Sequence, residues 1–143
     1  MKRFLSKLPL FKKWVPRLNN LNERTDWVEK QLKNLSKKSS ILDAGCGSQR
    51  FRKFCKHLNY KAQDFGEYKS DEKEVIGVGG GGLGNDSGYR YGPLDYVGDI
   101  WDIKERDDVF DAILCTEVFE HIPYPVETVR EFGRLLKPGG QLI

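Results

Sequence analysis

Hydrophobic and polar positions follow two different periods along the chain. Short apolar runs predict strands at residues 41–43, 60–64, 94–97 and 110–115, and a fifth strand begins at 141–143. The strands at 41–43 and 60–64 each end in an aspartate, and a further aspartate, Asp99, closely follows the strand at 94–97. An apolar run that ends in an acid is typical of a buried strand whose end carries a functional group.

Apolar residues before and between the strands recur at the spacing of a helix. Helices are expected from Thr25 or Asp26 to Leu35, over 50–58, and from about Pro125 to the Lys-Pro-Gly-Gly turn at 137–140. Strands that alternate with helices indicate a parallel sheet with right-handed crossovers, so we predict an α/β fold with flanking helices. The residues expected to face inward are Trp27, Val28, Leu32 and Leu35, then Phe51, Phe54, Cys55 and Leu58, and finally Val129, Phe132 and Leu136.

Two domains are predicted, an N-terminal basic and amphipathic helical segment at 1–36 and a ligand-binding α/β domain at 37–143. Residues 1–18 carry Lys and Arg but no acid, and their apolar residues form a stripe that Pro9 and Pro16 interrupt. Such a segment fits a helix that covers the domain, a helix that contacts a membrane surface or a partner, or a frayed tail.

The composition limits which partners and which cellular location are expected for the protein. The formal charge of +3 over 143 residues is too small to indicate a nucleic-acid partner, and none is expected. No apolar run approaches the ~18 residues of a membrane span, and a signal peptide is not expected. Three cysteines without a CxxC pair argue against a disulfide framework and favour a reducing, cytoplasmic location.

Glycines are concentrated in two places. Residues 77–92 include four consecutive glycines, but no Lys-Ser/Thr pair follows them as a phosphate-binding P-loop requires. We interpret this stretch as a surface insert that can fold over a ligand. Gly45 and Gly47 directly follow the first strand, where a strand, a glycine turn and a helix start together form a ligand site.

Polar residues follow four of the predicted strands, at Asp43, Asp64, Asp99 and the pair Thr116–Glu117. The carboxyl ends of parallel strands lie at one edge of a sheet, so these residues are expected to converge there. A dinucleotide fits poorly, since Arg50 occupies the third glycine position of its motif and the Asp43 charge opposes a pyrophosphate. S-adenosylmethionine, with an ammonium group, a ribose and an adenine, fits the acids better.

Four motifs carry a family resemblance over about residues 39–143. Residues 41–47 (ILDAGCG), 98–100 (GDI), 110–122 (FDAILCTEVFEHI) and 134–140 (RLLKPGG) resemble, in order and spacing, those of class I S-adenosylmethionine-dependent methyltransferases of the type 11 branch. The resemblance implies a Rossmann-like parallel sheet. The family sheet has seven strands, so this chain is expected to be incomplete, with strands one to four and the start of strand five. It is then a C-terminally truncated fragment, or it needs a partner to complete it.

The resemblance also implies roles for individual residues. Asp43, Gly45 and Gly47, with Ala44 in the same motif, hold the methionine end of S-adenosylmethionine. Asp64 binds the ribose, and Phe65 lies beside the adenine. Asp99 and Ile100 address the adenine, and Thr116 supports the methionine amino group. Two of these residues have a purely structural alternative to cofactor binding. Asp99 can instead form a turn, and Thr116 can instead be a cap.

Methyl transfer is an in-line displacement that needs a base only when the acceptor is protonated. His121 is the candidate base, and a histidine that only packs is the alternative. Glu117, Glu120 and His121 are spaced to share one helical face. They form a Glu-x-x-Glu-His run similar to that of ubiquinone-pathway O-methyltransferases. A metal site at these three residues is a weak alternative, and no metal is predicted.

The acceptor is expected to be a small molecule or a glycan- or lipid-linked compound, because residues 58–68 resemble methyltransferases encoded among surface-glycan genes. Two other functions stay open. The chain can be a non-catalytic fragment that binds a cofactor or a partner, or a nucleotide-dependent oxidoreductase. Transfer of a methyl group separates the enzyme from the binding fragment, and binding of NAD identifies the oxidoreductase.

Overall fold

The computed structural model describes residues 20–66 and 92–143. The predictions for residues 1–18 and for nearly all of the glycine-rich stretch lie outside these residues. Packing divides the chain into two compact units, 1–35 and 36–143. In the described residues, no helix has both the length and the apolar character needed to cross a membrane.

The described part of the first unit is the helix α3 (Asn20–Asn34), which begins earlier than predicted. Val28, Leu32 and Leu35 are buried, at the i, i+4 and i+7 spacing of a single helical face. The prediction that Trp27 faces inward is wrong, since 54% of this residue is exposed. Trp27 precedes Val28 by one residue, which rotates it about 100° away from the buried face.

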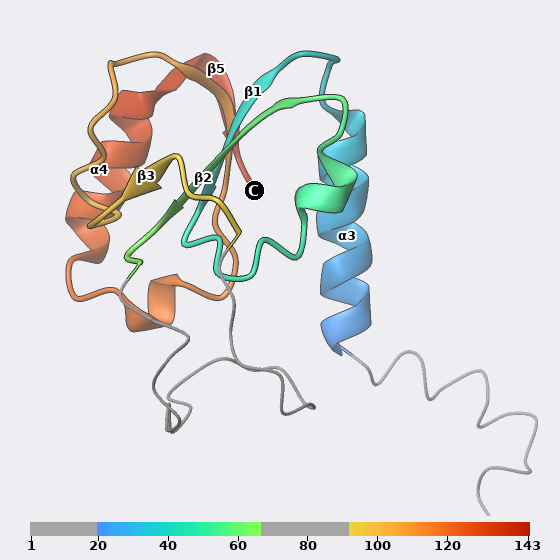
Figure 1. Cartoon of the computed structure of the whole chain (residues 1–143), viewed down its shortest axis with the longest axis horizontal. Coiled ribbons are helices and arrows are strands. Elements are labelled where there is room, and N and C mark those ends of the chain that lie inside the picture. The colour runs from blue at the N-terminus through green and yellow to red at the C-terminus, as the bar shows by residue number, and fades with distance from the viewer. Residues whose placement is uncertain (1–19, 67–91) are drawn as a thin grey trace, which may run out of the picture. The chain divides into compact units, whose positions relative to one another are not determined.

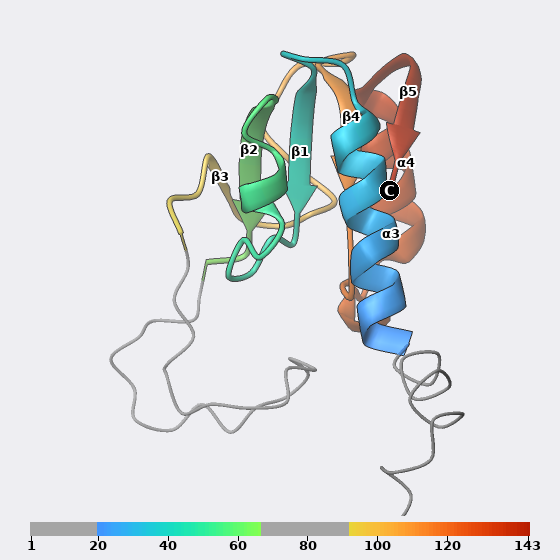
Figure 2. The same ribbon diagram turned by 90° about the vertical axis from the view of Figure 1, so that its right-hand side faces the viewer.

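The second unit is built on one sheet of five parallel strands in the order β3-β2-β1-β4-β5. Figure 2 shows this order across the sheet. The order reverses between β1 and β4, which is the switch point where open α/β sheets bind ligands. The predicted α/β, Rossmann-like sheet with flanking helices is thus confirmed. The strands are β1 (Ser40–Ala44), β2 (Asn59–Asp64), β3 (Tyr96–Val97), β4 (Phe110–Leu114) and β5 (Leu136–Leu142).

The helix expected over 50–58 is absent. The chain forms successive three-residue turns there, with a short 3-10 helix η2 (Arg52–Phe54) at their centre. The N–H of Cys55 donates to Arg52 O at 3.0 Å, and the N–H of Leu58 donates to Cys55 O at 2.9 Å. Such turns still bury Phe51, Cys55 and Leu58, whereas Phe54, also expected to face inward, is only half-buried. The apolar pattern thus identified three of the four side chains correctly but not the type of helix.

The helix α4 (Pro125–Leu135) begins at the predicted proline and packs on one face of the sheet (Figure 1). Its buried residues are Thr128, Phe132 and Leu135. The prediction that Val129 and Leu136 lie on the inner face of this helix is wrong, because Val129 is 52% exposed and Leu136 already belongs to β5. Phe132 and Leu135 share a core cluster with Leu42, Ala44, Ile100, Ile103, Phe110 and Ile113.

The lengths of two strands also differ from prediction. β3 has only two residues rather than the four expected at 94–97. β5 begins at Leu136 and includes the Lys-Pro-Gly-Gly stretch expected to be a turn. Its pairing with β4 shifts between Phe110 and Ala112, because the residues between Leu136 and Gln141 form an irregularity in the ladder.

Asp111 joins the starts of three strands. Its carboxylate accepts from the Ser40 N–H at the start of β1 and from Lys137 Nζ at the start of β5, both at 2.8 Å. The hydrogen bond from Lys137, followed by that from Ser40, holds the pKa of Asp111 below its ordinary value. The carboxylate therefore stabilises the fold above the unfolded pKa, and this contribution is lost as the pH falls through the lower folded pKa.

We expect Asp111→Ala to lower the free energy of unfolding at neutral pH by about 1–2 kcal/mol, since two hydrogen bonds to a half-exposed charge are lost. Urea denaturation measures the change, and the difference from the wild type should vanish in acid. Asp102→Ala is the control, because it removes only an exposed pair with Lys104 and should change stability by less than about 0.5 kcal/mol. Equal effects of the two substitutions would contradict the assigned role.

Candidate functional site

The glycine turn after β1 directs its N–H groups toward β2. Gly45 N–H donates to Gln63 Oε1 at 3.1 Å, Cys46 N–H to Gln63 O at 3.0 Å, and Gly47 N–H to Asp64 Oδ2 at 2.8 Å. Gly45 and Gly47 have φ of 67° and 51°, which glycine adopts without strain. Three consecutive donors are thus engaged within the protein. These three N–H groups are therefore not available to bind an anionic ligand.

Asp43 lies beneath this turn, on the face of the sheet opposite α4. Only 3% of the residue is exposed, and its Oδ2 accepts from the Tyr60 hydroxyl at 2.5 Å. Burial raises the pKa of Asp43 to about 6, with a smaller rise from the nearby Asp64 charge, while the Tyr60 hydrogen bond and Arg50 partly oppose the rise. Asp43 can therefore act on a ligand through its charge below the turn more than by direct contact.

Asp64 ends β2 and receives two backbone hydrogen bonds. Gly47 N–H donates to Oδ2, and the N–H of Phe65 donates to Oδ1 at 2.8 Å. Each carboxylate oxygen has two lone pairs, so both can still accept from a ligand hydroxyl. Phe65 is 48% exposed at the same strand end, which leaves its ring free to stack on a planar group.

The segment after β3 contains Asp99 and Ile100. Asp99 lines a cavity of about 310 Å3 together with Gln63, Asp95 and the stretch Tyr96–Gly98. The Ile100 side chain belongs to the hydrophobic core, so only its backbone can face a ligand. The backbone carbonyl of Asp99 accepts from the Asp102 N–H at 3.2 Å, which fits the turn-forming alternative.

The segment after β4 lies over the glycine turn. A Cβ atom placed on Gly45 would lie 2.6 and 2.8 Å from the two methyl groups of Val118, so the two segments are in close contact. Thr116 is half-buried just before this contact. His121 is exposed in the short 3-10 helix η3 (Phe119–His121), which follows directly.

The shared helical face proposed for Glu117, Glu120 and His121 is not formed. Glu117 has a φ of 58° and precedes the 3-10 helix, so the three residues do not continue one helix. Within 20–66 and 92–143, no three His, Cys, Asp or Glu side chains gather as metal ligands. The left-handed backbone of Glu117 lies three residues after β4, in the segment at the switch point, and strained residues often occur at functional sites.

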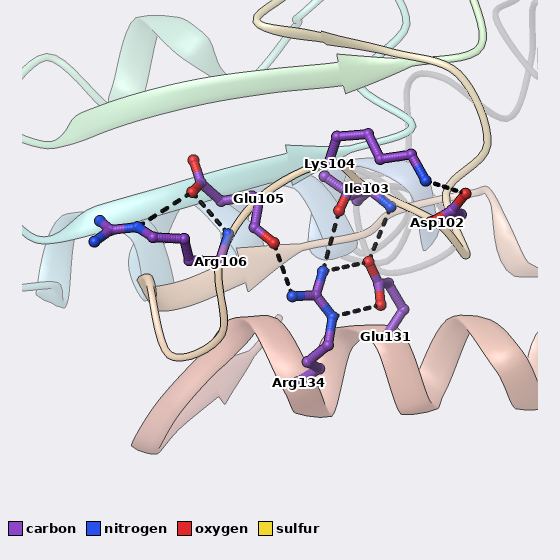
Figure 3. A pocket seen from close by; sticks show the side chains of 7 residues that line it. All are labelled: Asp102, Ile103, Lys104, Glu105, Arg106, Glu131 and Arg134. Atoms are coloured by element: carbon purple, nitrogen blue, oxygen red, sulfur yellow. Dashed lines mark hydrogen bonds and ion pairs between the residues drawn. The ribbon is translucent and has the colours of Figure 1, made fainter.

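A larger pocket, of about 410 Å3, lies between α4 and residues 102–106 (Figure 3). Its charged side chains are bonded to one another or to the backbone. Arg134 donates to both carboxylate oxygens of Glu131 and to the Ile103 and Glu105 carbonyls, and hydrogen bonds with Glu131 and Asp107 raise its pKa. This network fastens the segment after β3 to α4, so we assign it a structural role rather than a ligand site.

The groups at the carboxyl edge suit a cation better than an anion. Asp43 and Asp64 lie at the carboxyl ends of β1 and β2, and Asp99 follows β3, whereas the N–H groups of the turn are already bonded. A pyrophosphate would meet carboxylates without the donors it needs. A sulfonium nucleoside with an ammonium group would meet compensating charge, and its ribose hydroxyls could donate to Asp64. The residues present therefore fit S-adenosylmethionine and do not fit a dinucleotide.

Two residues that bond to groups at this edge were not among those predicted from the sequence. Gln63 is 2% exposed and links the turn after β1 to the segment after β3, since its Nε2 donates to Gly98 O at 2.7 Å. Tyr60 provides the hydrogen bond to Asp43. The available signal for Gln63 was a polar residue within an otherwise buried strand end. The sequence contains no such signal for Tyr60, because its hydrogen bond to Asp43 depends on the register between β1 and β2.

The sheet order, the switch point and the acidic strand ends define a class I S-adenosylmethionine-dependent methyltransferase domain. A model of the methyltransferase domain family matches residues 12–143, and the chain belongs to this family. S-adenosyl-L-methionine is the cofactor that membership implies. The match extends over all the strands and both segments that carry the candidate site.

Curated relatives and solved structures agree with this assignment. The ubiquinone biosynthesis O-methyltransferase of Pseudomonas entomophila is 27% identical over 128 residues, which cover 87% of this chain and 51% of that protein. That of Xanthomonas oryzae pv. oryzae is 50% identical over 38 residues, 27% of this chain and 16% of that protein. A crystal structure described as a methyltransferase from Bacillus halodurans C-125 has a TM-score of 0.57 at 22% identity, covering 80% of this chain and 47% of that chain. The chain spans about half the length of the curated relatives that it matches over most of its residues.

Proposed function

We propose that this chain binds S-adenosylmethionine at the carboxyl edge of its sheet and transfers the methyl group to a small-molecule or a glycan- or lipid-linked acceptor. The observation that carries the proposal is the arrangement of Asp43 and Asp64 around a turn whose N–H groups are engaged within the protein. Such an edge favours a cationic cofactor over a pyrophosphate.

In this proposal the residues act in sequence along the cofactor. Asp43 supplies charge beneath the methionine end, which rests on Ala44, Gly45 and Gly47 with support from Thr116. Asp64 accepts hydrogen bonds from the ribose. The adenine lies between Phe65, whose ring is exposed, and the Asp99–Ile100 segment at the 310 Å3 cavity.

The names of the curated relatives favour a hydroxyl group on a small molecule as the acceptor, because they are O-methyltransferases. His121 is exposed and follows the switch-point segment, so a neutral imidazole there can take the proton that a hydroxyl loses during methyl transfer. We place the protein in the cytoplasm. Cys46, Cys55 and Cys115 are free, and burial raises the pKa of each thiol to about 12, as suits structural cysteines in a reducing compartment.

Transfer of a radiolabelled methyl group from S-adenosylmethionine to a panel of phenols, quinols and sugars tests the proposal. We expect product with a hydroxyl acceptor, and His121→Asn should lower its rate at neutral pH by about 10²-fold, the scale of general-base catalysis. The loss should shrink as the pH rises and the acceptor ionises unaided. Binding of S-adenosylmethionine without transfer to any acceptor would instead support the non-catalytic reading. An unchanged rate in His121→Asn would remove the base from the proposal.

A further inference from the structure

Gln63 occupies an unusual position for a polar side chain. It is 2% exposed near the end of β2, and both ends of its carboxamide are bonded. Oε1 accepts from the Gly45 N–H at 3.1 Å, and Nε2 donates to the Gly98 carbonyl at 2.7 Å. A backbone N–H requires an acceptor and a carbonyl requires a donor, so the orientation of the amide is fixed by its partners.

The two partners belong to different halves of the site. Gly45 is in the turn proposed to hold the methionine end of the cofactor. Gly98 directly precedes Asp99, at the proposed adenine end, and has a φ of 130°, which is accessible mainly to glycine. Gln63 thus connects the two segments that must be correctly spaced to bind one elongated ligand. Its own backbone also contributes, since Gln63 O accepts from the Cys46 N–H at 3.0 Å.

The neutral amide suits this position for electrostatic reasons. A carboxylate here would face the Gly98 carbonyl without a donor, and it would add charge to an edge that is already acidic. An aliphatic side chain would leave the Gly45 N–H and the Gly98 carbonyl without their buried partner. The charged residues around Gln63 are Asp43 on the neighbouring strand β1, Asp64 next to it at the end of β2, and Asp95, Asp99, Asp102 and Lys104 around the cavity that it lines.

We propose that Gln63 is a positioning residue that couples the methionine turn to the adenine segment through its carboxamide. This inference rests on the proposed function, because it assigns the two segments to two ends of S-adenosylmethionine. Gln63 itself contacts the backbone and not the reacting atoms. It acts by fixing the distance between Gly45 and Gly98 before the ligand binds.

Gln63→Glu provides a conditional test, since a protonated carboxyl group offers one donor and one acceptor as the amide does, whereas a carboxylate offers acceptors only. Binding of S-adenosylhomocysteine is measured by calorimetry for the wild type and the variant at about pH 5 and about pH 8. Burial and the surrounding acids favour the protonated form of the introduced carboxyl group at the lower pH. We expect the ratio of variant to wild-type Kd to be at least about tenfold at the higher pH and to fall toward one at the lower pH. Taking the ratio cancels the pH dependence of the other groups.

Thr128→Val is the control for lost stability. It removes a buried hydrogen bond to the Tyr124 carbonyl at the start of α4 but leaves the bonds of Gln63 to Gly45 and Gly98 in place, so its Kd ratio should stay near one at both pH values. If the wild type binds and the Gln63→Glu ratio does not change with pH, the inference is overturned. A folded wild type that fails to bind would overturn the proposed function, and this result is visible without any variant.

Amide hydrogen exchange in the absence of ligand tests the bridge by itself. Gln63→Met should raise the exchange rate of the Gly45 amide by at least about tenfold, because the amide loses its partner. The Cys55 amide, which donates within η2, should keep its rate. Unchanged exchange at Gly45 would show that Gln63 does not hold the turn, and it would overturn the inference whatever the outcome of the titrations.

Discussion

Replacing Asp43 by asparagine is expected to stabilise the ligand-free chain relative to the wild type as the pH rises, and the gain at about pH 8 should exceed that at about pH 4 by about 2 kcal/mol. Burial raises the pKa of the folded carboxyl group to about 6, whereas the unfolded group keeps a value near 4. The folded state therefore binds the proton more tightly. The resulting stability is fully present below the unfolded pKa and is lost as the pH rises through the folded value.

Asparagine cannot ionise, so it avoids this loss, and its carbonyl oxygen can still accept from the Tyr60 hydroxyl. Urea denaturation of both proteins across the pH range measures the difference. Tyr60→Phe is a matched control, because the hydrogen bond from Tyr60 lowers the pKa of Asp43 and its removal should make the loss of stability with pH steeper. Parallel pH profiles for wild type and Asp43→Asn would contradict the assigned burial of the charge.

The same substitution should weaken binding of S-adenosylhomocysteine by at least about tenfold at neutral pH, since a charge that favours the ligand ammonium is removed. Asp43 would then lower the folding stability of the chain but raise its affinity for the ligand. Its unfavourable burial would thus be retained because it serves ligand binding. In the wild type, affinity should fall below about pH 6, because protonation of Asp43 removes its charge.

Gly45→Ala is expected to lower the free energy of unfolding by about 3 kcal/mol and to abolish most cofactor binding. A φ of 67° strains alanine by about 1–2 kcal/mol. The added methyl group also lies 2.6 Å from a Val118 methyl, and overpacking of this kind typically costs about 1–3 kcal/mol. Displacement of Val118 would disturb the contact between the segments after β1 and β4 at the switch point.

Two variants separate the causes of this effect. Adding Val118→Ala to Gly45→Ala should recover the part of the lost stability that comes from the steric clash. The part that comes from backbone strain should remain. Gly133→Ala should instead raise stability by about 0.5–1 kcal/mol, because this helical glycine in α4 has no atom within 4 Å of the added methyl group. Thermal and urea denaturation measure all three proteins. A Gly45→Ala protein as stable as the wild type would contradict the close contact.

The strand pattern was predictable from the sequence because buried parallel strands are short apolar runs with distinct ends. β1, β2 and β4 were placed within about two residues, an accuracy typical of strong apolar patterns. The segment at 50–58 was mistaken for a helix because turns with i to i+3 hydrogen bonds also bring Phe51 and Cys55 to one side. Val129 was misplaced because two apolar stripes fit α4, and only tertiary packing selects the one through Thr128 and Phe132.

The candidate site was predictable at the level of strand ends, but its internal bonding was not. The sequence indicates that Asp43, Asp64 and Asp99 lie at one edge. It does not show that the turn donates its N–H groups to Gln63 and Asp64, because these bonds depend on the register that pairs Ala44 with Gln63. The burial of Asp43 likewise arises from packing between β1, β2 and the turns that follow.

Calorimetric titration of S-adenosylhomocysteine into the purified chain, beside Asp64→Asn, tests the central claim most directly. The variant keeps one acceptor for the backbone N–H groups but presents an amide where the ribose hydroxyls need a carboxylate, and circular dichroism checks that it folds. We expect the wild type to bind one equivalent, and the variant to bind at least about tenfold more weakly. A folded wild-type chain that binds no S-adenosylhomocysteine, or binds it equally well without the Asp64 carboxylate, would contradict the proposed cofactor site.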